Sequence, residues 1–230
     1  MIAIIPARSG SQGLRNKNIL IINSIPLIAH TIKAALKSKL TKEVIVMTDS
    51  KKIANISKKY GASVPFLRPK KLSTSKSMVM DTYIYCIDKI NSKSKNNIQN
   101  FVALLPTSPL RLAEDIDNAI KIFKKEKASS VISVCKQHKP IEWSLVKKKN
   151  YKFSPLFNKK SNILNRDEYI DTIIPNGSIY VFNFSKLKKY RKYYFSDSRY
   201  YLMPKNRSID IDDYYDFIHA EKLLEIKNKL

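Results

Sequence analysis

Small and cationic residues gather in a short stretch directly after the first apolar run of the chain. Residues 3–18 have the sequence AIIPARSGSQGLRNKN and include Arg8, Arg15 and Lys17 together with Gly13. A small-residue loop at the carboxyl end of a buried strand presents backbone N–H groups, and nearby cationic side chains neutralise anionic oxygens. The stretch matches neither the GxGxxG dinucleotide pattern nor the GxxxxGK(S/T) phosphate loop. It therefore predicts a phosphate site of another type, with a lysine-decorated surface turn as the alternative.

A pair of carboxylates near the C-terminus is the second candidate site. Asp210 and Asp212 flank Ile211, and in an extended segment residues two apart point the same way. Oxygen ligands of this kind suit a Mg²⁺ ion that bridges the phosphates of a nucleotide. The alternative is that Asp212 and Asp213 cap the last helix.

Apolar patterning predicts the elements that would position these groups. Strands are predicted at 2–5, 43–48, 62–66, 101–105, 130–134, 178–182 and 199–203, and helices at 26–39, 78–90, 114–125 and 214–227. Asp49 or Ser50 is predicted to cap a further helix, which ends before Gly61. This alternation predicts a Rossmann-like three-layer α/β/α fold with a mainly parallel sheet. Sites in such sheets gather at the carboxyl ends of the strands, where the first loop, Arg68 and residues 106–111 all lie.

The regular pattern is lost between residues 138 and 174. This stretch contains Trp143, lysine clusters and aromatic residues without a helical period, and we interpret it as a small protruding arm, in the form of a β-hairpin, inserted into the sheet domain. Residues 1–230 are predicted to form one domain, because a chain of this length can bury one sizeable core.

Composition narrows the class of protein. Hydrophobic residues make up 43% of the chain, which argues against disorder. No apolar run is long enough to cross a bilayer and the N-terminus lacks a signal-peptide pattern, so a cytoplasmic protein without a membrane partner is expected. Cys86 and Cys135 are too few for a disulfide framework or a zinc site.

The charge of the chain raises the possibility of a nucleic-acid partner. The net charge is +24, from 43 basic and 19 acidic residues. The lysines are scattered over predicted solvated helix faces, and no RNA-binding or zinc-finger pattern is present. Nucleic acid is therefore not an expected partner, although the field would favour anionic substrates.

Five sequence blocks resemble one family. The stretch at 7–18 resembles the ARxGSKGLxxKN signature of the acylneuraminate cytidylyltransferases, the CMP-sialic acid or CMP-nonulosonate synthetases. Blocks at 67–69, 106–111, 176–180 and 208–212 follow in the family's order and spacing (LRP, PTSPLR, NGSIY and SIDID). The resemblance implies transfer of CMP from CTP to a nonulosonic acid with release of pyrophosphate, with Mg²⁺ as cofactor, for surface glycan synthesis. It also implies a homodimer, in which the arm at 138–174 reaches over the partner's active site.

The resemblance implies roles for individual residues. The catalytic residues would be Arg8, Lys17, Asp210 and Asp212, with the two aspartates as the Mg²⁺ ligands. The nucleotide-binding residues would be Arg8, Ser11, Gln12, Gly13, Lys17, Asn18, Arg68 and Ser77. The sugar-binding residues would be Leu105, Ser108, Arg111, Arg166, Asn176 and Tyr180. None of these side chains is a convincing general base.

Two residues depart from the family pattern. Gln12 stands where the family usually has Lys, and Leu105 precedes PTSPLR where the family usually has Gln. Gln12 removes a positive charge from the triphosphate site, and Leu105 removes an amide expected to hydrogen-bond the sugar. Both changes are compatible with a pseudaminic- or legionaminic-type acceptor, and also with an impaired paralogue. A nucleotidyltransferase for another sugar acid or a sugar phosphate, and a non-catalytic polyanion-binding protein, are the alternatives.

Overall fold

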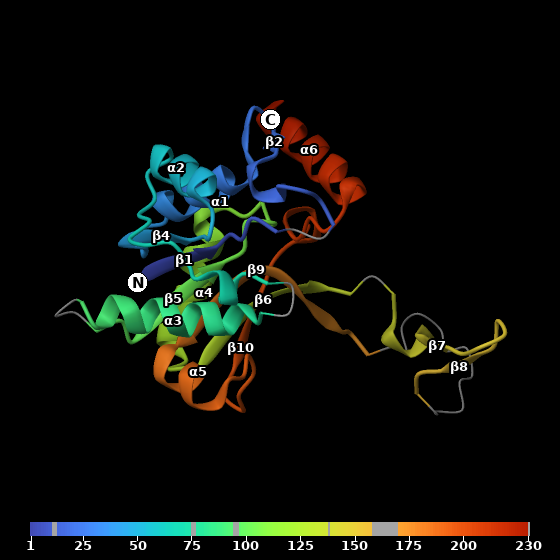
Figure 1. Ribbon diagram of the computed structural model, residues 1–230. Coiled ribbons are helices and arrows are strands. Elements are labelled where there is room, and N and C mark those ends of the chain that lie inside the picture. Colours follow the sequence, from blue (N-terminus) through green and yellow to red (C-terminus); the bar gives the residue numbers. More distant parts are fainter. Residues whose placement is uncertain (11–12, 75–76, 94–96, 138, 158–169, 230) are drawn as a thin grey trace.

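The computed structural model describes residues 1–10, 13–74, 77–93, 97–137, 139–157 and 170–229 (Figure 1). A six-stranded sheet in the order β10-β6-β9-β5-β1-β4 forms its centre. The strands of this sheet are β1 (Ile2–Pro6), β4 (Glu43–Met47), β5 (Asn100–Leu104), β6 (Ser130–Lys136), β9 (Ile173–Asn183) and β10 (Arg199–Leu202). Only β9 runs against the others, antiparallel to both β5 and β6. The prediction of a mainly parallel sheet is confirmed.

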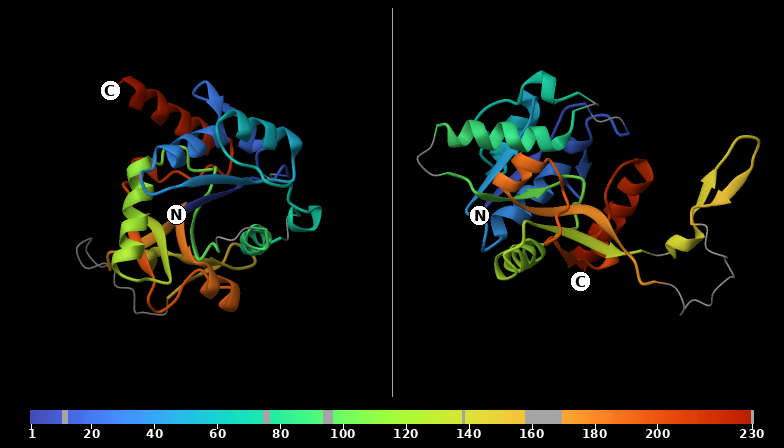
Figure 2. Two further views of the ribbon diagram at one scale, coloured as in Figure 1. Left: turned by 90° about the vertical axis from the view of Figure 1, so that its left-hand side faces the viewer. Right: turned by 90° about the horizontal axis from the view of Figure 1, so that it is seen from below.

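Helices cover both faces of the sheet (Figure 2). The helices are α1 (Leu27–Lys37), α2 (Lys51–Lys59), α3 (Val79–Asn91), α4 (Ala113–Lys125), α5 (Phe184–Tyr190) and α6 (Tyr214–Lys229). Ala3 and Ile5 of β1 share a core cluster with α1, α2 and α4, whereas Ile4 shares one with α3 and α5. Side chains of a strand alternate between its faces, so the continuous apolar run of β1 fills two cores and makes the three-layer α/β/α fold.

A third apolar cluster ties the C-terminal part of the chain to the loop that follows β1. It joins Ile22 of β2 (Ile21–Ile22) and Leu27 of α1 to Ile211 and to Leu224 of α6. The strand β2 pairs with β3 (Ile25–Pro26) in a separate two-stranded sheet. Burial of Ile211 holds Asp210 and Asp212 close to the N-terminal loop.

Three elements differ from the predictions. The strand predicted at 62–66 is wrong: only Ser63 pairs, in one parallel bridge to Ile45 of β4. Pro65 has no N–H to donate to a ladder, which limits pairing here. The helix α5 was not predicted, and β9 begins at Ile173, inside the range predicted for the arm.

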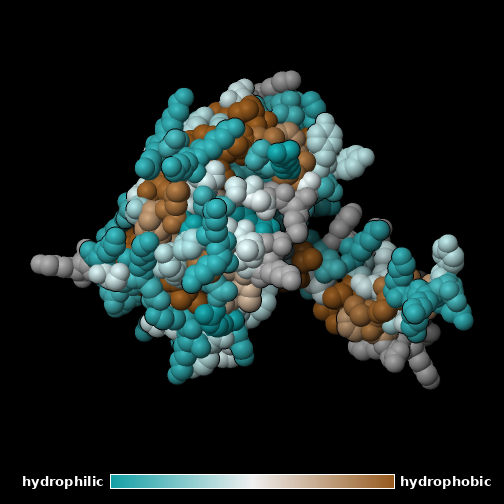
Figure 3. Space-filling view, in the orientation of Figure 1, coloured by the Kyte–Doolittle hydropathy of each residue, from teal (hydrophilic) through white to brown (hydrophobic). Residues whose placement is uncertain are grey.

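The described part of the arm stands away from the body of the molecule (Figure 1, Figure 2). Its strands β7 (Leu145–Lys147) and β8 (Phe153–Pro155) pair as an antiparallel hairpin. Apolar side chains are exposed on the arm (Figure 3), namely Trp143, Leu145, Val146, Tyr151, Phe153, Leu156 and Phe157. His138 and residues 158–169 of the predicted arm lie outside the described residues. No described helix is long and apolar enough to cross a membrane.

Candidate active site

A cavity of about 590 Å³ lies at the carboxyl ends of β1 and β5. The predicted residues that line it are Arg8, Gly13, Lys17, Asn18, Arg68, Ser77, Leu105, Asp210 and Asp212. Every described residue of the predicted catalytic and nucleotide-binding sets is among them. Three cationic side chains and two carboxylates therefore converge on one cavity, although they come from loops far apart in the sequence.

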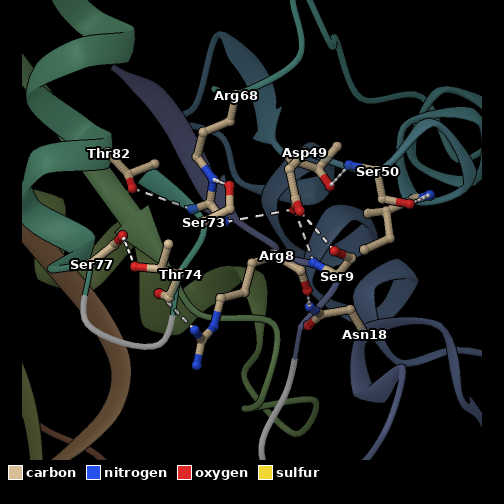
Figure 4. A network of polar contacts seen from close by, with 12 residues as sticks. Arg8, Ser9, Asn18, Asp49, Ser50, Arg68, Ser73, Thr74, Ser77 and Thr82 are labelled. Atoms are coloured by element: carbon tan, nitrogen blue, oxygen red, sulfur yellow. Dashed lines mark hydrogen bonds and ion pairs between the residues drawn. The ribbon is translucent and has the colours of Figure 1, made fainter. Parts of the chain in front are cut away.

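Arg68 lines this cavity and is held in place by three neighbouring side chains (Figure 4). It is 6% exposed, its Nε donates to Ser73 Oγ at 3.0 Å, and its Nη1 donates to Thr82 Oγ1 at 3.2 Å. The remaining nitrogen, Nη2, lies 3.8 Å from Asp49 Oδ1 and is buried without a hydrogen-bond partner. Burial lowers the pKa of the Arg68 guanidinium, and the charge of Asp49 opposes this shift. A fixed cation with one unused donor is suited to hold an anionic or carbonyl oxygen.

The loop after β1 is tied to its surroundings through Arg8 and Ser9 (Figure 4). Ser9 donates from its N–H and its hydroxyl to the two oxygens of Asp49, at 2.9 and 2.7 Å. Arg8 Nη1 donates to the carbonyl of Thr74 at 2.9 Å, and Asn18 Nδ2 donates to the carbonyl of Arg8 at 3.0 Å. The bond between Arg8 and Thr74 thereby links the described part of the N-terminal loop to a second segment that lines the cavity.

Ser77 completes this side of the cavity. Its hydroxyl lies 2.8 Å from Thr74 Oγ1 and donates to the carbonyl of Lys71 at 3.0 Å. The hydroxyl groups of Thr74 and Ser77 are thus preorganised by their own hydrogen bonds, and they face the loop that carries Arg8 (Figure 4).

Lys17 connects the N-terminal loop to the carboxylates. It lies in a short 3₁₀ helix (Lys17–Ile19) and is only 9% exposed. Its Nζ donates to the carbonyl oxygen of Ile211 at 2.5 Å and lies 3.3 Å from Asp212 Oδ1. An ammonium group that is anchored on one side by a carbonyl keeps its charge directed toward the cavity.

Asp210 and Asp212 both line the cavity but differ in burial. Asp210 Oδ1 is buried without a hydrogen-bond partner, whereas the Asp212 side chain is 84% exposed. Burial raises the pKa of the Asp210 carboxyl, and the hydroxyl of Thr107 opposes this shift. The backbone N–H groups of Asp212 and Asp213 both donate to Asp216 Oδ2, at 2.9 and 3.1 Å. The turn between the two candidate ligands and α6 is therefore fixed.

The two carboxylates fit a hard divalent cation. A buried, unpartnered carboxylate oxygen beside a second carboxylate supplies the oxygen ligands that Mg²⁺ prefers. Within the described ranges, no group of three or more His, Cys, Asp or Glu residues could hold a metal ion. The donor set therefore suits Mg²⁺, which characteristically takes one or two carboxylates together with phosphate oxygens and water.

Arg111 has a different environment from the one predicted. It is 3% exposed, and its guanidinium donates to the carbonyls of Leu105 and Ser178 and to the hydroxyl of Thr31, each at 2.9 Å. Burial lowers the pKa of Arg111 to about 9, while Asp115 and Asp210 oppose the shift. These donors hold the segment 105–111 against α1 and β9, and the predicted role of Arg111 in sugar binding stays a prediction.

Asn176 and Ser108 are also internal. The Asn176 side-chain oxygen accepts from Ser133 Oγ at 2.6 Å and its nitrogen donates to Ser208 Oγ at 2.9 Å, while Ser108 is fully buried. Neither residue lines the cavity, and their predicted role as sugar ligands stays a prediction. Tyr180 does not line it either: its ring stacks on Phe182, and burial raises the pKa of its hydroxyl to about 12.

Leu105 does line the cavity, and its carbonyl is turned toward Arg111. The predicted residues Ser11, Gln12 and Arg166 lie outside the described residues. Sequence reasoning missed two residues of the site, Asp49 and Thr82, which orient Arg68. The sequence pattern predicts Asp49 or Ser50 as a helix cap, and Ser50 fills that role by accepting from the N–H of Ile53. Its position directly after a buried strand was the available signal.

The chain matches the family model for cytidylyltransferases over residues 2–228. It is 36% identical over 230 residues to the N-acylneuraminate cytidylyltransferase of Escherichia coli, which covers 100% of this chain and 53% of that protein. It is 35% identical over 232 residues to the CMP-N,N'-diacetyllegionaminic acid synthase of Legionella pneumophila, which covers 100% of this chain and 98% of that protein. The chain thus spans about half the length of the first relative and nearly all of the second.

A solved structure of CMP:2-keto-3-deoxy-manno-octonic acid synthetase complexed with CTP has the same fold, with a TM-score of 0.73 at 16% identity over 98% of both chains. The family model covers nearly the whole chain, and two relatives share more than a third of its residues. On these grounds the chain belongs to the cytidylyltransferase family.

Proposed function

We propose that the protein transfers CMP from CTP to a nonulosonic acid and releases pyrophosphate. The observation that carries this proposal is the convergence of Arg8, Lys17, Arg68, Asp210 and Asp212 on one cavity at the carboxyl ends of the parallel strands. This charge pattern suits a triphosphate, whose oxygens need cations and whose magnesium needs carboxylates. The names of the relatives from Escherichia coli and Legionella support a nonulosonic acid as the acceptor.

Each part of the cavity has a role in this reaction. Arg8 and Lys17 neutralise the phosphates, while Arg68, Asn18 and Ser77 hold the ribose and the base. The anomeric hydroxyl of the acid attacks the α-phosphorus and the pyrophosphate leaves, so positioning and charge neutralisation supply most of the rate. Asp210 and Asp212 would hold Mg²⁺, which when bound would supply charge compensation to the triphosphate and the leaving pyrophosphate.

The acceptor pocket adjoins Leu105. A leucine in this wall cannot hydrogen-bond a sugar hydroxyl, but it gives an apolar contact to a methyl group. We therefore propose a 9-deoxy nonulosonic acid of the pseudaminic or legionaminic type as the preferred acceptor, for the synthesis of a surface glycan such as lipopolysaccharide or capsule. The use of CTP places the reaction in the cytoplasm.

The arm supports a homodimer as the working form. The described part of the arm exposes large apolar side chains, with Leu145 56% and Phe153 65% exposed. Clustered apolar surface on a projecting hairpin marks a protein interface more often than a solvated face. In the proposed dimer, each arm covers the partner's cavity and brings Arg166 to it.

The experiment that tests the function is CTP-dependent pyrophosphate release with a panel of nonulosonic acids. Parallel reactions contain ATP, GTP or UTP, and others contain sugar phosphates. We expect release only with CTP and a nonulosonic acid. Release with another nucleotide or with a sugar phosphate would favour a different nucleotidyltransferase. Salt-sensitive binding to polyanions with no release from any mixture would favour a non-catalytic protein.

A further inference from the structure

Two glycines lie directly against the segment that carries both candidate metal ligands. The chain contains only four glycines, and two of them contact residues 210–212 from different elements. A Cβ built on Gly13 would lie 2.2 Å from the carbonyl oxygen of Asp212, and a Cβ built on Gly177 would lie 2.3 Å from Asp210 Oδ2. Real Cβ atoms essentially never lie this close to an oxygen, so any other residue would have to displace one partner.

At Gly177 the displaced partner would be a carboxylate. The Cβ would also lie 3.0 Å from Asp210 Cγ, so rotation of the oxygens alone does not relieve the contact. Gly177 lies in β9 at an irregularity of its pairing with β6, but the backbone on either side is held, because Pro175 pairs with Val134 and Ile179 pairs with Leu104. The Asp210 carboxyl, whose Oδ1 is buried without a hydrogen-bond partner, would therefore be the partner that moves, and it would lose its interaction with the Thr107 hydroxyl.

At Gly13 the displaced partner would be backbone. Residues 211 and 212 are fixed by three bonds: Ile211 N to the carbonyl of Thr107, Lys17 Nζ to the carbonyl of Ile211, and Asp212 N to Asp216 Oδ2. A side chain at residue 13 would break one of these bonds or push the N-terminal loop away. Lys17 lies on that same loop, so its distance to Asp212 would change as well.

We infer that Gly13 and Gly177 are positioning residues, whose missing side chains leave room for the Asp212 backbone carbonyl and the Asp210 carboxylate and so fix the two candidate metal ligands. This inference rests on the proposed function. It predicts that metal affinity in the nucleotide complex, rather than folding alone, depends on glycine at both positions. Groups that orient metal ligands typically contribute about tenfold to a hundredfold in metal affinity.

The chain offers a matched control for each substitution. Gly177 and Gly61 both have positive φ, at +71° and +94°, so alanine strains the backbone at either position. Gly61 lies after α2, outside the cavity lining, and a Cβ there would meet only Leu36 Cδ1, at 3.0 Å. Gly10 precedes Gly13 in the same loop, and a Cβ there meets nothing within 4 Å.

The test is calorimetric CTP binding at increasing Mg²⁺, without an acceptor so that CTP is not consumed. We expect Gly177→Ala and Gly13→Ala to raise the Mg²⁺ midpoint about tenfold or more, while Gly61→Ala and Gly10→Ala keep the wild-type midpoint. Gly177→Ala and Gly61→Ala should lower the thermal midpoint to a similar extent. In an Asp210→Ala background, Gly177→Ala should leave the Mg²⁺ midpoint unchanged, because its contact partner is gone.

Equal Mg²⁺ midpoints for Gly177→Ala and Gly61→Ala, in a wild type that binds CTP with Mg²⁺, would overturn the inference and leave the proposed function standing. If the wild type shows no Mg²⁺-dependent CTP binding, the proposed function itself fails. Should Gly177→Ala not fold, Gly13→Ala against Gly10→Ala carries the same test, and equal midpoints for that pair would count against it.

Discussion

Replacement of Arg111 by methionine separates a scaffold role from direct sugar binding. Methionine keeps most of the buried stem but supplies no donor, so the carbonyls of Leu105 and Ser178 lose the bonds that they now receive. An unsatisfied buried acceptor costs about 1–3 kcal/mol, and the Ser178 carbonyl contributes most of this loss, because the Leu105 carbonyl keeps a bond from Thr31 Oγ1 at 3.4 Å. The buried charge is itself costly, which is why burial lowers the pKa of Arg111 to about 9. Its removal offsets part of the loss, so we expect a net loss of about 1–2 kcal/mol.

Urea unfolding measures this loss directly, and we expect the midpoint to fall by roughly 1 M. The matched control is Arg199→Met on β10, where the arginine is exposed and pairs with Glu126 at 3.5 Å. A surface pair of this kind contributes at most about 1 kcal/mol. If Arg111→Met keeps the wild-type free energy of unfolding, but raises KM for the sugar acid tenfold without changing KM for CTP, the scaffold role is wrong and the guanidinium binds the sugar.

Three further predictions concern stability, specificity and assembly. Burial raises the pKa of Asp117, but hydrogen bonds from Ser38 Oγ and two backbone N–H groups outweigh this effect and hold the pKa below 3.8. Asp117→Asn should therefore lower the free energy of unfolding by about 1–3 kcal/mol at pH 7 and by little at pH 3. An equal loss at both pH values, measured by urea unfolding, would refute this. The wild type should prefer a 9-deoxy acid to N-acetylneuraminate, and Leu105→Gln should shift the kcat/KM ratio about tenfold to a hundredfold toward N-acetylneuraminate; a wild-type preference for N-acetylneuraminate would contradict it. Mixing Arg166→Ala chains with Asp212→Asn chains should restore part of the activity through one intact hybrid site, whereas a monomer, or no rescue after subunit exchange, would argue against the dimer.

The parts of the fold that local sequence determines were predicted well. The apolar run at 2–5 became β1, and helical periodicity placed α1, α3 and α4 to within a few residues of their bounds. The segment 62–66 has a similar apolar content but makes a single bridge, at Ser63. The helix α5 begins when Asn183 accepts from the N–H of Lys186, and its lysine-rich sequence gives little periodicity. The reversed direction of β9 depends on pairing partners distant in the chain, which local pattern does not encode.

The candidate site divides in the same way. Cations, hydroxyls and carboxylates that follow strand ends could be predicted, because the topology brings those ends together. The environment of Arg111 could not be predicted in this way, since it depends on Ser178, 67 residues later in the chain. The unequal burial of Asp210 and Asp212 also depends on distant contacts, with Thr107 and Lys17.

Mass-spectrometric detection of the product tests the central claim most directly. The protein is incubated with CTP, Mg²⁺ and a 9-deoxy nonulosonic acid, beside Asp210→Asn and Asp212→Asn variants that keep the wild-type circular dichroism spectrum. The account predicts a CMP–sugar conjugate and an equal amount of pyrophosphate from the wild type, and almost none from either variant, because the lost carboxylate leaves Mg²⁺ with one protein ligand. The absence of a conjugate from the wild type with every nonulosonic acid, or equal yields from all three proteins, would contradict it.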